Sequence, residues 1–179
     1  MHSRTWWVRL VLAIALIGIG LIGSSVARIA RERGDIAAEI VVNAAGIFPP
    51  APLFDMTIDQ WDNMLDINTR GTFLVARACA RQMYEGGAMV NLASKSAIQP
   101  TIGMAHYSAS KGAVHALVKW LSRNAITKGV LVNAVAPGPV QTAMTRNSSI
   151  AELTPMKRMG RAEELAWPIA FLCTPAASY

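Results

Sequence analysis

Four short apolar runs, separated by stretches long enough for helices, constrain this chain more than any other feature. The runs are Val11–Ile17, Glu39–Val42, Ala88–Leu92 and Leu131–Val135. The first is apolar at every position, as is typical of a parallel strand that is buried on both faces. Strands that alternate with helices indicate a parallel sheet with helices packed against it. We therefore predict an α/β fold with three layers and a doubly wound parallel sheet.

Composition narrows the class of protein. Apolar types make up 53% of the 179 residues and charged types 16%, which excludes a disordered chain and allows one domain with a core. Cys79 and Cys173 do not form a CxxC pair, and the three histidines are scattered, so we predict no metal site. The net charge of +6 is not gathered in a Lys/Arg-rich run, and we predict no nucleic-acid partner.

Three helices are predicted in the second part of the chain. Thr57 and Gln60 have the spacing of a capping box, which opens a helix. Its expected inward positions are Trp61, Leu65, Val75 and Ala76. The other two helices are predicted from Tyr107 to about Lys128 and from about Ala162 to Leu172.

A glycine turn follows the first apolar run. Gly18, Gly20 and Gly23 form a GxGxxG pattern, and a helix is predicted after it over 24–33. Such glycines permit a tight turn, close approach of the backbone to a pyrophosphate, and close packing of helix on strand. Residues 10–42 resemble the dinucleotide-binding segment of prephenate dehydrogenases. The next strand ends in Asn43, where an acidic residue that binds ribose is expected, so the preference between NAD and NADP is not predicted.

The same N-terminal region has an alternative interpretation. Residues 10–27 carry no charged side chain, and their length of roughly 27 Å as a helix just matches the hydrocarbon thickness of a bilayer. They would then form a membrane anchor or a cleaved signal. The arginines at 28, 31 and 33 would keep the remainder in the cytoplasm. We favour the strand and glycine turn, hence a cytoplasmic protein, and keep the membrane-anchored form as the alternative.

Candidate catalytic residues lie near the predicted strand ends. Tyr107 and Lys111 are four residues apart on one helix and share a face. A neighbouring ammonium is expected to lower the pKa of the phenol and make it a usable general acid or base. Ser94 follows a strand and can donate to a substrate carbonyl, and the amide of Asn68 can hold a water that feeds protons to Lys111. Taken singly, each residue has an ordinary structural explanation as a cap, turn or helix residue.

The joint order of these residues carries a family resemblance. The strings IVVNAAGI, WDNMLDINTRGTF, MVNLAS, YSASKGAVHAL, GVLVNAVAPGPVQT and RMGRAEELA occur in this order. Over roughly residues 36–179 the chain resembles the short-chain dehydrogenase/reductase family. The resemblance implies a catalytic tetrad at Asn68, Ser94, Tyr107 and Lys111.

The same resemblance implies a Rossmann-like fold and hydride transfer between NAD or NADP and a small alcohol or ketone. Tyr107 would pass the hydroxyl proton, and Lys111 would also bind the nicotinamide ribose. The cofactor contacts that it implies, beyond Tyr107 and Lys111, are Asn43, Ala44, Ala45, Gly46, Pro137, Gly138, Val140 and Thr142. It also suggests a homodimer or homotetramer through the helices at 58–83 and 107–128.

The chain departs from the family pattern before residue 43. Only 42 residues precede Asn43, too few for the two further strands with crossovers that the family has there. We therefore predict one domain over 1–179, with a β-α-β unit at 10–42 joined to a catalytic part at 43–179. The second and third strands of the family and its last strand are expected to be missing.

This join allows two positions for strand 39–42, and we expect it to lie beside strand 11–17 so that Gly46 stays near Ser94.

A catalytically impaired remnant that no longer holds its cofactor is the alternative function. Substrate is expected to meet the loops at 95–106 and 141–155, through Ile98, Ile102, Met104 and Met144.

Overall fold

The structure, a computed structural model, describes residues 13–17, 39–83, 85–145, 151–152 and 154–178. Its sheet has four parallel strands in the order β1-β2-β3-β4. The strands are β1 (Ala13–Ile17), β2 (Glu39–Asn43), β3 (Ala88–Leu92) and β4 (Leu131–Val135). Since β2 pairs with β1 on one side and with β3 on the other, strand 39–43 occupies the position that the sequence predicted for it.

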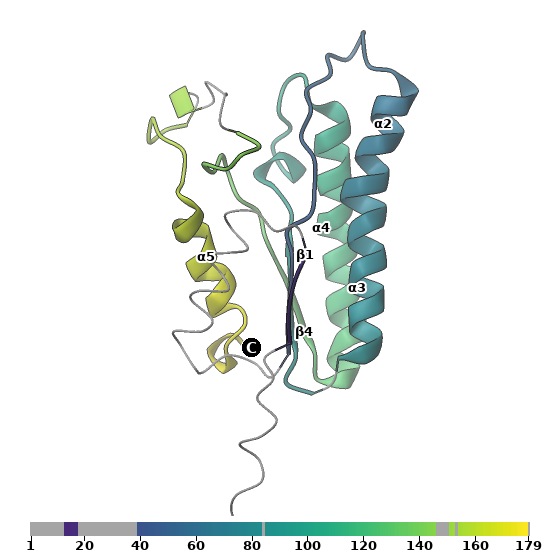
Figure 1. The fold of residues 1–179 in the computed structure, drawn as a ribbon, viewed down its shortest axis with the longest axis vertical. Helices are drawn as coiled ribbons and strands as arrows, with labels where there is room; N and C mark the ends of the chain where they lie inside the picture. The colour runs from purple at the N-terminus through teal and green to yellow at the C-terminus, as the bar shows by residue number, and fades with distance from the viewer. Residues whose placement is uncertain (1–12, 18–38, 84, 146–150, 153, 179) are drawn as a thin grey trace, which may run out of the picture.

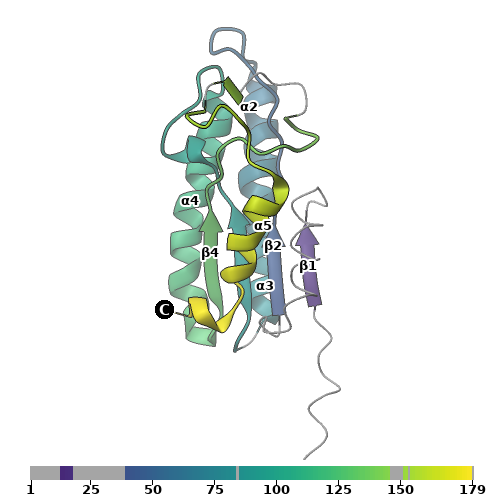
Figure 2. The same ribbon diagram turned by 90° about the vertical axis from the view of Figure 1, so that its left-hand side faces the viewer.

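Helices cover both faces of this sheet. On one face lie α2 (Ile58–Leu65), α3 (Gly71–Gln82) and α4 (Ala105–Ala125), and on the other lies α5 (Ala162–Phe171). Figure 1 shows the sheet edge-on between the two layers, and Figure 2 shows α5 in front of the strands. The three-layer parallel fold predicted from the alternation of apolar runs is confirmed.

Local sequence explains where the first of these helices starts. The Thr57 side chain accepts from the Gln60 N–H at 3.2 Å, and the Gln60 side chain accepts from the Thr57 N–H at 2.9 Å. This reciprocal pair is a capping box, which satisfies two backbone donors that a helix start leaves without partners. The capping box predicted from the spacing of these two residues is therefore present.

The helix predicted to continue from Thr57 is interrupted. Between α2 and α3, the five residues Asp66–Arg70 form a π-helical segment, η2. The fully buried positions of the α2–η2–α3 stretch are Met64, Asn68, Thr72 and Ala76. The predicted inward face is therefore correct only for Ala76, because Trp61, Leu65 and Val75 are half-buried. A π segment shifts the phase of a helix, and the 3.6-residue pattern does not carry across it.

Two apolar clusters hold the layers together. The cluster under α5 joins Ile40, Val42 and Val90 of the sheet to Ile169. The cluster under α3 and α4 consists mainly of Val41, Ala76, Met89, Val114, Leu121 and Val132. Alternate residues of each strand therefore face opposite layers, as the period of two in a strand requires.

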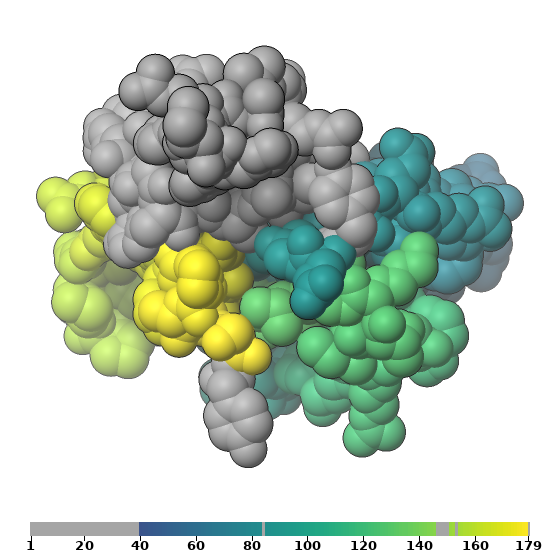
Figure 3. Space-filling model, turned by 90° about the horizontal axis from the view of Figure 1, so that it is seen from below, coloured from purple at the N-terminus to yellow at the C-terminus, as the bar shows by residue number. Residues whose placement is uncertain are grey.

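The two ends of the parallel sheet differ. All four strands run in one direction, so their carboxyl ends and the loops that follow lie at the same end of the molecule (Figure 2). Figure 3 shows the opposite end, where the C-terminal residues (yellow) lie beside the turn that leads from α4 into β4 (green). In that turn Gly129 has a φ of 69°, which favours glycine.

Part of the N-terminal prediction is tested. Residues 13–17 form a strand, as the strand interpretation of the N-terminus expects. Gly18, Gly20 and Gly23 of the predicted pyrophosphate turn, and the helix predicted over 24–33, lie outside the described residues. Among the helices that the structure describes, none has both the length and the apolar character needed to cross a bilayer.

Candidate active site

The candidate site is built at the carboxyl ends of β2, β3 and β4. Ser94 follows β3, and backbone bonds fix this end of β3 to the end of β4. The Ala93 N–H donates to the Val135 carbonyl at 2.9 Å, and the Lys95 N–H donates to the Pro137 carbonyl at 2.9 Å. These hydrogen bonds between the ends of β3 and β4 fix the backbone on both sides of Ser94.

Lys111 reaches this strand end from the first half of α4. Its side chain is buried, and the ammonium Nζ donates to the Leu92 carbonyl at 2.8 Å. Nζ also lies 5.9 Å from the centroid of the Tyr107 ring. Burial lowers the pKa of Lys111 to about 8, because a desolvated ammonium is less stable than a hydrated one. The predicted approach of Lys111 to Tyr107 is confirmed.

Tyr107 lies half-buried on the same helix, one turn before Lys111. Its ring meets Phe48 edge-on, with ring centroids 4.5 Å apart and an interplanar angle of 79°. Burial raises the pKa of Tyr107 above its ordinary value, and hydrogen bonding with Ser94 partly opposes this rise. The sequence argument expected the neighbouring ammonium to lower this pKa, and that direction is wrong. Spacing reveals which residues are neighbours, but desolvation depends on how the whole fold covers them.

Asn68 lies in the π-helical segment and is fully buried. Its Oδ1 accepts from the Ile47 N–H at 2.8 Å, and its Nδ2 donates to the Ile47 carbonyl at 3.0 Å. Nδ2 also lies 3.1 Å from the Ser110 hydroxyl, which donates to the Tyr107 carbonyl at 2.7 Å. The amide that was expected to hold a water therefore joins the loop after β2 to the catalytic helix. Sequence reasoning missed Ser110, although it lies four residues after the buried His106 on the same helix face.

Gly46 lies close to the side chains of Asn68 and Lys111. A Cβ at this position would lie 3.1 Å from Asn68 Oδ1 and 3.5 Å from Lys111 Nζ. Gly46 therefore lies against the same side chains that surround the end of β3, as predicted from the strand order. Because any larger residue would press on Asn68, the glycine keeps this stretch of backbone accessible to a ligand.

The neighbouring candidate cofactor contacts differ in exposure. Asn43 is buried, its Oδ1 accepts from the Ala45 N–H at 3.4 Å, and its Nδ2 has no hydrogen-bond partner. Ala44 and Ala45 follow it, are half-buried and carry only methyl side chains. A dinucleotide lying here would therefore meet mainly backbone atoms and methyl groups.

The loop after β4 supplies the opposite side. Gly138 is exposed, and a Cβ built on it would meet nothing within 4 Å. Val140 pairs with Gly160 through an isolated bridge, which attaches this loop to the segment before α5. The Thr142 N–H donates to the Thr145 hydroxyl at 3.0 Å. The structure thus places Pro137, Gly138, Val140 and Thr142 on one loop and shows an internal bond for Thr142.

The residues expected to meet substrate divide into two groups. Ile98, Ile102 and Met144 are exposed, and Ile102 is 99% exposed. Met104 is 4% exposed, so the prediction that it lines a substrate pocket is wrong. It is the N-cap residue of α4, at the end of the loop that connects β3 with that helix.

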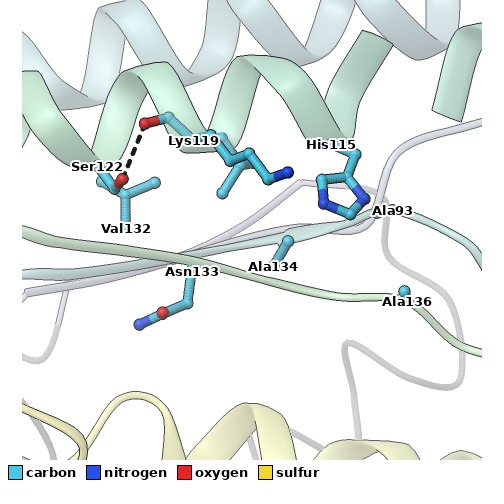
Figure 4. A pocket seen from close by; sticks show the side chains of 9 residues that line it. Ala93, His115, Lys119, Ser122, Val132, Asn133, Ala134 and Ala136 are labelled. Atoms are coloured by element: carbon cyan, nitrogen blue, oxygen red, sulfur yellow. Dashed lines mark hydrogen bonds between the residues drawn. The ribbon is translucent and has the colours of Figure 1, made fainter. Parts of the chain in front are cut away.

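Two hollows lie away from the tyrosine. One, of about 360 Å³, is lined by Gln141, Arg158, Met159 and Arg161. The other, of about 300 Å³, lies between α4 and β4, where His115 and Lys119 extend over the strand (Figure 4). Neither is lined by Ser94, Tyr107 or Lys111. In the described part of the chain, no three His, Cys, Asp or Glu side chains gather as a metal site would require.

The geometry fits proton transfer to an oxygen at the end of β3. A phenol is flanked by a hydroxyl and a buried ammonium, and a glycine-containing loop leaves backbone open beside them. A phenol in this setting can exchange a proton with an alcohol or a carbonyl oxygen placed between it and the serine.

Comparison with known proteins gives a consistent result. Residues 22–179 match the sequence profile of the family described as enoyl-(acyl carrier protein) reductase. The chain is 37% identical over 147 residues to a 3-oxoacyl-[acyl-carrier-protein] reductase of Synechocystis, covering 79% of this chain and 60% of that protein. A short-chain dehydrogenase/reductase from Brucella melitensis superposes with a TM-score of 0.79 at 28% identity, covering 93% of this chain and 91% of that one.

A further solved structure, BdcA in complex with NADPH, superposes with a TM-score of 0.78 at 26% identity, covering 93% of this chain and 88% of that one. The chain spans about three fifths of the length of these curated relatives.

Proposed function

This chain belongs to the short-chain dehydrogenase/reductase family, and from that premise we propose that it is an NAD(P)-dependent oxidoreductase. The reaction is hydride transfer between the nicotinamide and a small alcohol or ketone. The observation that carries the proposal is the arrangement of Ser94, Tyr107 and the buried Lys111 at the end of β3, beside Gly46. The relatives whose names include a reductase activity, and the solved relative in complex with NADPH, support it.

Each side chain has a separate part in this reaction. Tyr107 gives its phenolic proton to the carbonyl oxygen during reduction and takes it back during oxidation. Ser94 donates a hydrogen bond to the same oxygen, which stabilises the charge that develops there. Lys111, whose pKa is about 8, is mostly protonated at neutral pH and stabilises the phenolate that forms when Tyr107 gives up its proton.

Residues of the loops after β2 and β4 would hold the nicotinamide half of the cofactor. A Cβ at Gly46 would lie close to Asn68 and Lys111, so the glycine leaves room beside them, and a Cβ at Gly138 would meet nothing within 4 Å. Asn43, Ala44 and Ala45 line the β2 side, and Pro137, Val140 and Thr142 line the β4 side. When bound, the nicotinamide supplies or accepts the hydride, and Lys111 holds its ribose. The pyrophosphate is assigned to the turn with Gly18, Gly20 and Gly23.

Assembly and location complete the proposal. We propose a cytoplasmic homodimer or homotetramer formed through α2, α3 and α4, whose outer surface carries the exposed Leu74 and Trp120. Sedimentation at several protein concentrations tests the assembly. The chain is proposed to form one domain, with residues 10–42 supplying the phosphate turn and residues 43–179 the catalytic groups.

The test is NADPH- or NADH-dependent turnover with a panel of ketones. The panel includes acetoacetyl-CoA, because one relative, 36% identical, is named an acetoacetyl-CoA reductase. Tyr107→Phe is expected to abolish turnover, a loss of at least ~1000-fold, while the far-ultraviolet spectrum and melting temperature stay unchanged. Turnover of Tyr107→Phe at the wild-type rate would contradict the assignment of Tyr107.

The alternative function, a remnant without catalysis, makes a different prediction. It expects no heat on titration with millimolar NAD or NADP, because the cofactor is not held. The oxidoreductase expects a saturable signal with one of the two dinucleotides. Calorimetry therefore separates the two functions without requiring that the natural substrate be known.

A further inference from the structure

Side-chain hydroxyls tie the loop between β3 and α4 to both of its ends. The Ser96 N–H donates to the Ser94 hydroxyl at 3.1 Å. The hydroxyls of Ser96 and Thr101 lie 2.8 Å apart and share one hydrogen bond. The Thr101 N–H donates to the Ser108 hydroxyl at 3.3 Å. A continuous chain of polar contacts therefore runs from Ser94 to the first turn of α4.

The three serines in this series of polar contacts are buried, although much of the loop is exposed. Ser94, Ser96 and Ser108 are 6–8% exposed, whereas Ile98 and Ile102 on the same loop are 71% and 99% exposed. Burying a hydroxyl is unfavourable unless it is hydrogen-bonded. The hydrogen bond with Thr101 therefore compensates for the burial of the Ser96 hydroxyl. The loop is thus held by polar contacts, while the side chains of Ile98 and Ile102 lie outside.

The bond from Ser96 also limits where the Ser94 proton can point. A serine hydroxyl has one proton and two lone pairs. The Ser96 N–H occupies one lone pair from the side of the 3-10 helix η3 (Lys95–Ala97), for which Ser94 is the N-cap. The proton and the other lone pair of the Ser94 hydroxyl remain available, and hydrogen bonding with Ser94 partly opposes the rise in the pKa of Tyr107.

The far end of the chain is attached beside the tyrosine. Ser108 directly follows Tyr107 in α4, and its own N–H donates to the Met104 carbonyl at 2.9 Å. The hydroxyl chain therefore connects the backbone next to Tyr107 with the hydroxyl of Ser94.

We propose that Ser96 and Thr101 are positioning residues, whose shared hydrogen bond holds the Ser94 hydroxyl toward Tyr107. This inference rests on the proposed function, because it assigns Ser96 and Thr101 a part in orienting the Ser94 hydroxyl that the reaction uses. Neither residue touches the reacting atoms. Lys111 is the charged group that faces the phenol ring, from the same helix.

The test compares Thr101→Val with Thr101→Ser. Valine keeps the shape of threonine but removes the hydroxyl, and serine restores it. Thr101→Val is expected to lower kcat by about tenfold and to leave the cofactor KM within about twofold, because only the orientation of Ser94 changes. Thr101→Ser is expected to behave like the wild type. Thr127→Val, at an exposed threonine after α4, is the matched control and is expected to change neither constant.

A second readout does not depend on turnover. The chain has three tyrosines, so tyrosine labelled with ¹³C at Cζ gives three NMR signals, and Tyr107→Phe identifies the one from Tyr107. Thr101→Val is expected to move the titration of this signal to higher pH, because a less well oriented Ser94 stabilises the phenolate less. The basic limb of the pH profile of kcat is expected to move in the same direction.

A further variant keeps the proposal testable if Thr101→Val does not fold. Ser96→Ala removes the same contact from the other side while keeping the N–H that donates to Ser94. It is expected to give the same shift as Thr101→Val, and the double variant is expected to give no larger shift than either alone. If the shifts of the two single variants add up in the double variant, loss of the shared hydrogen bond is not their common cause.

The outcomes separate this inference from the proposed function. If the wild type turns over ketones but Thr101→Val and Ser96→Ala leave both kcat and the Tyr107 titration unchanged, the positioning role is wrong and the proposed function stands. If no ketone is turned over but both variants move the Tyr107 titration, the positioning role stands and the proposed function fails.

Discussion

Both faces of the sheet are buried, but the side chains that fill them differ in kind. The α5 face is covered by aliphatic residues such as Val42, Val90 and Ile169. The α4 face also holds the buried Lys111, Asn43 and Asn91. Asn43 and Asn91 are paired neighbours on β2 and β3. Each lies two residues after a residue of the cluster under α3 and α4, Val41 or Met89, and therefore points to the same face. Buried polar groups are unfavourable unless they are paired or used. We infer that the residues facing α5 mainly stabilise the fold, whereas polar residues facing α4 take part in the reaction.

Lys111→Met sharpens this comparison with the largest expected effect. Methionine fills a similar volume but cannot donate to the Leu92 carbonyl or stabilise a phenolate. Turnover is expected to fall by more than about 100-fold while the fold is kept. Lys119→Met, at an exposed lysine two turns further along the same helix, is the control and is expected to keep wild-type turnover. Equal losses in both variants would show that the position of the charge is unimportant.

Ile169→Ala examines the other face. Ile169 is fully buried in the cluster under α5, and its truncation is expected to lower the free energy of unfolding by about 2–4 kcal/mol. Urea denaturation measures this loss. Turnover per folded molecule is expected to stay unchanged, because no catalytic group faces α5. A folded Ile169→Ala protein without activity would break the division between the two faces.

The pH dependence of stability is expected to follow Lys111. Its pKa of about 8 in the folded protein lies below the value of 10.5 in the unfolded chain, so the unfolded state binds more protons between these values. The contribution of Lys111 is therefore unfavourable below pH 8 and disappears as the pH rises. Between pH 7 and 9.5, the free energy of unfolding is expected to rise by on the order of 2 kcal/mol relative to Lys111→Met. Parallel pH curves for the two proteins would contradict burial of the ammonium.

Gly46→Ala is expected to have the smallest effect of the four. The new Cβ would lie 3.1 Å from Asn68 Oδ1, a distance that requires Asn68 to move by a few tenths of an ångström. The cofactor KM is expected to rise roughly three- to tenfold, with kcat and melting temperature nearly unchanged. Gly71→Ala at the start of α3, where the nearest atom to a new Cβ is the Asp66 carbonyl oxygen at 3.6 Å, is the matched control and is expected to leave the cofactor KM unchanged. An equal rise of the cofactor KM in both variants would contradict a cofactor site at Gly46.

Much of the fold follows from local sequence patterns. The apolar runs predicted β3 and β4 with the observed bounds, the capping box predicted the start of α2, and the order of the strands followed from keeping Gly46 near Ser94. These features depend on residues that are close in sequence or on the rules for parallel sheets. The neighbourhood of Tyr107 and Lys111 was predictable for the same reason, since both lie on one helix.

The remaining features depend on tertiary packing. The π-helical segment that carries Asn68 has no periodic signal, and the burial that raises the pKa of Tyr107 arises from segments far away in the sequence. The contact of Ser96 with Thr101 requires the loop to fold back on itself. A pattern of single residues gives no indication of such a contact.

The most direct test of the central claim is a crystal structure of the full chain with NADPH bound. The account predicts that the nicotinamide ring lies beside Tyr107, with its ribose next to Lys111 and its backbone contacts at Gly46 and Gly138. A cofactor bound at the hollow between α4 and β4, or a ring position filled by the protein's own side chains, would contradict it.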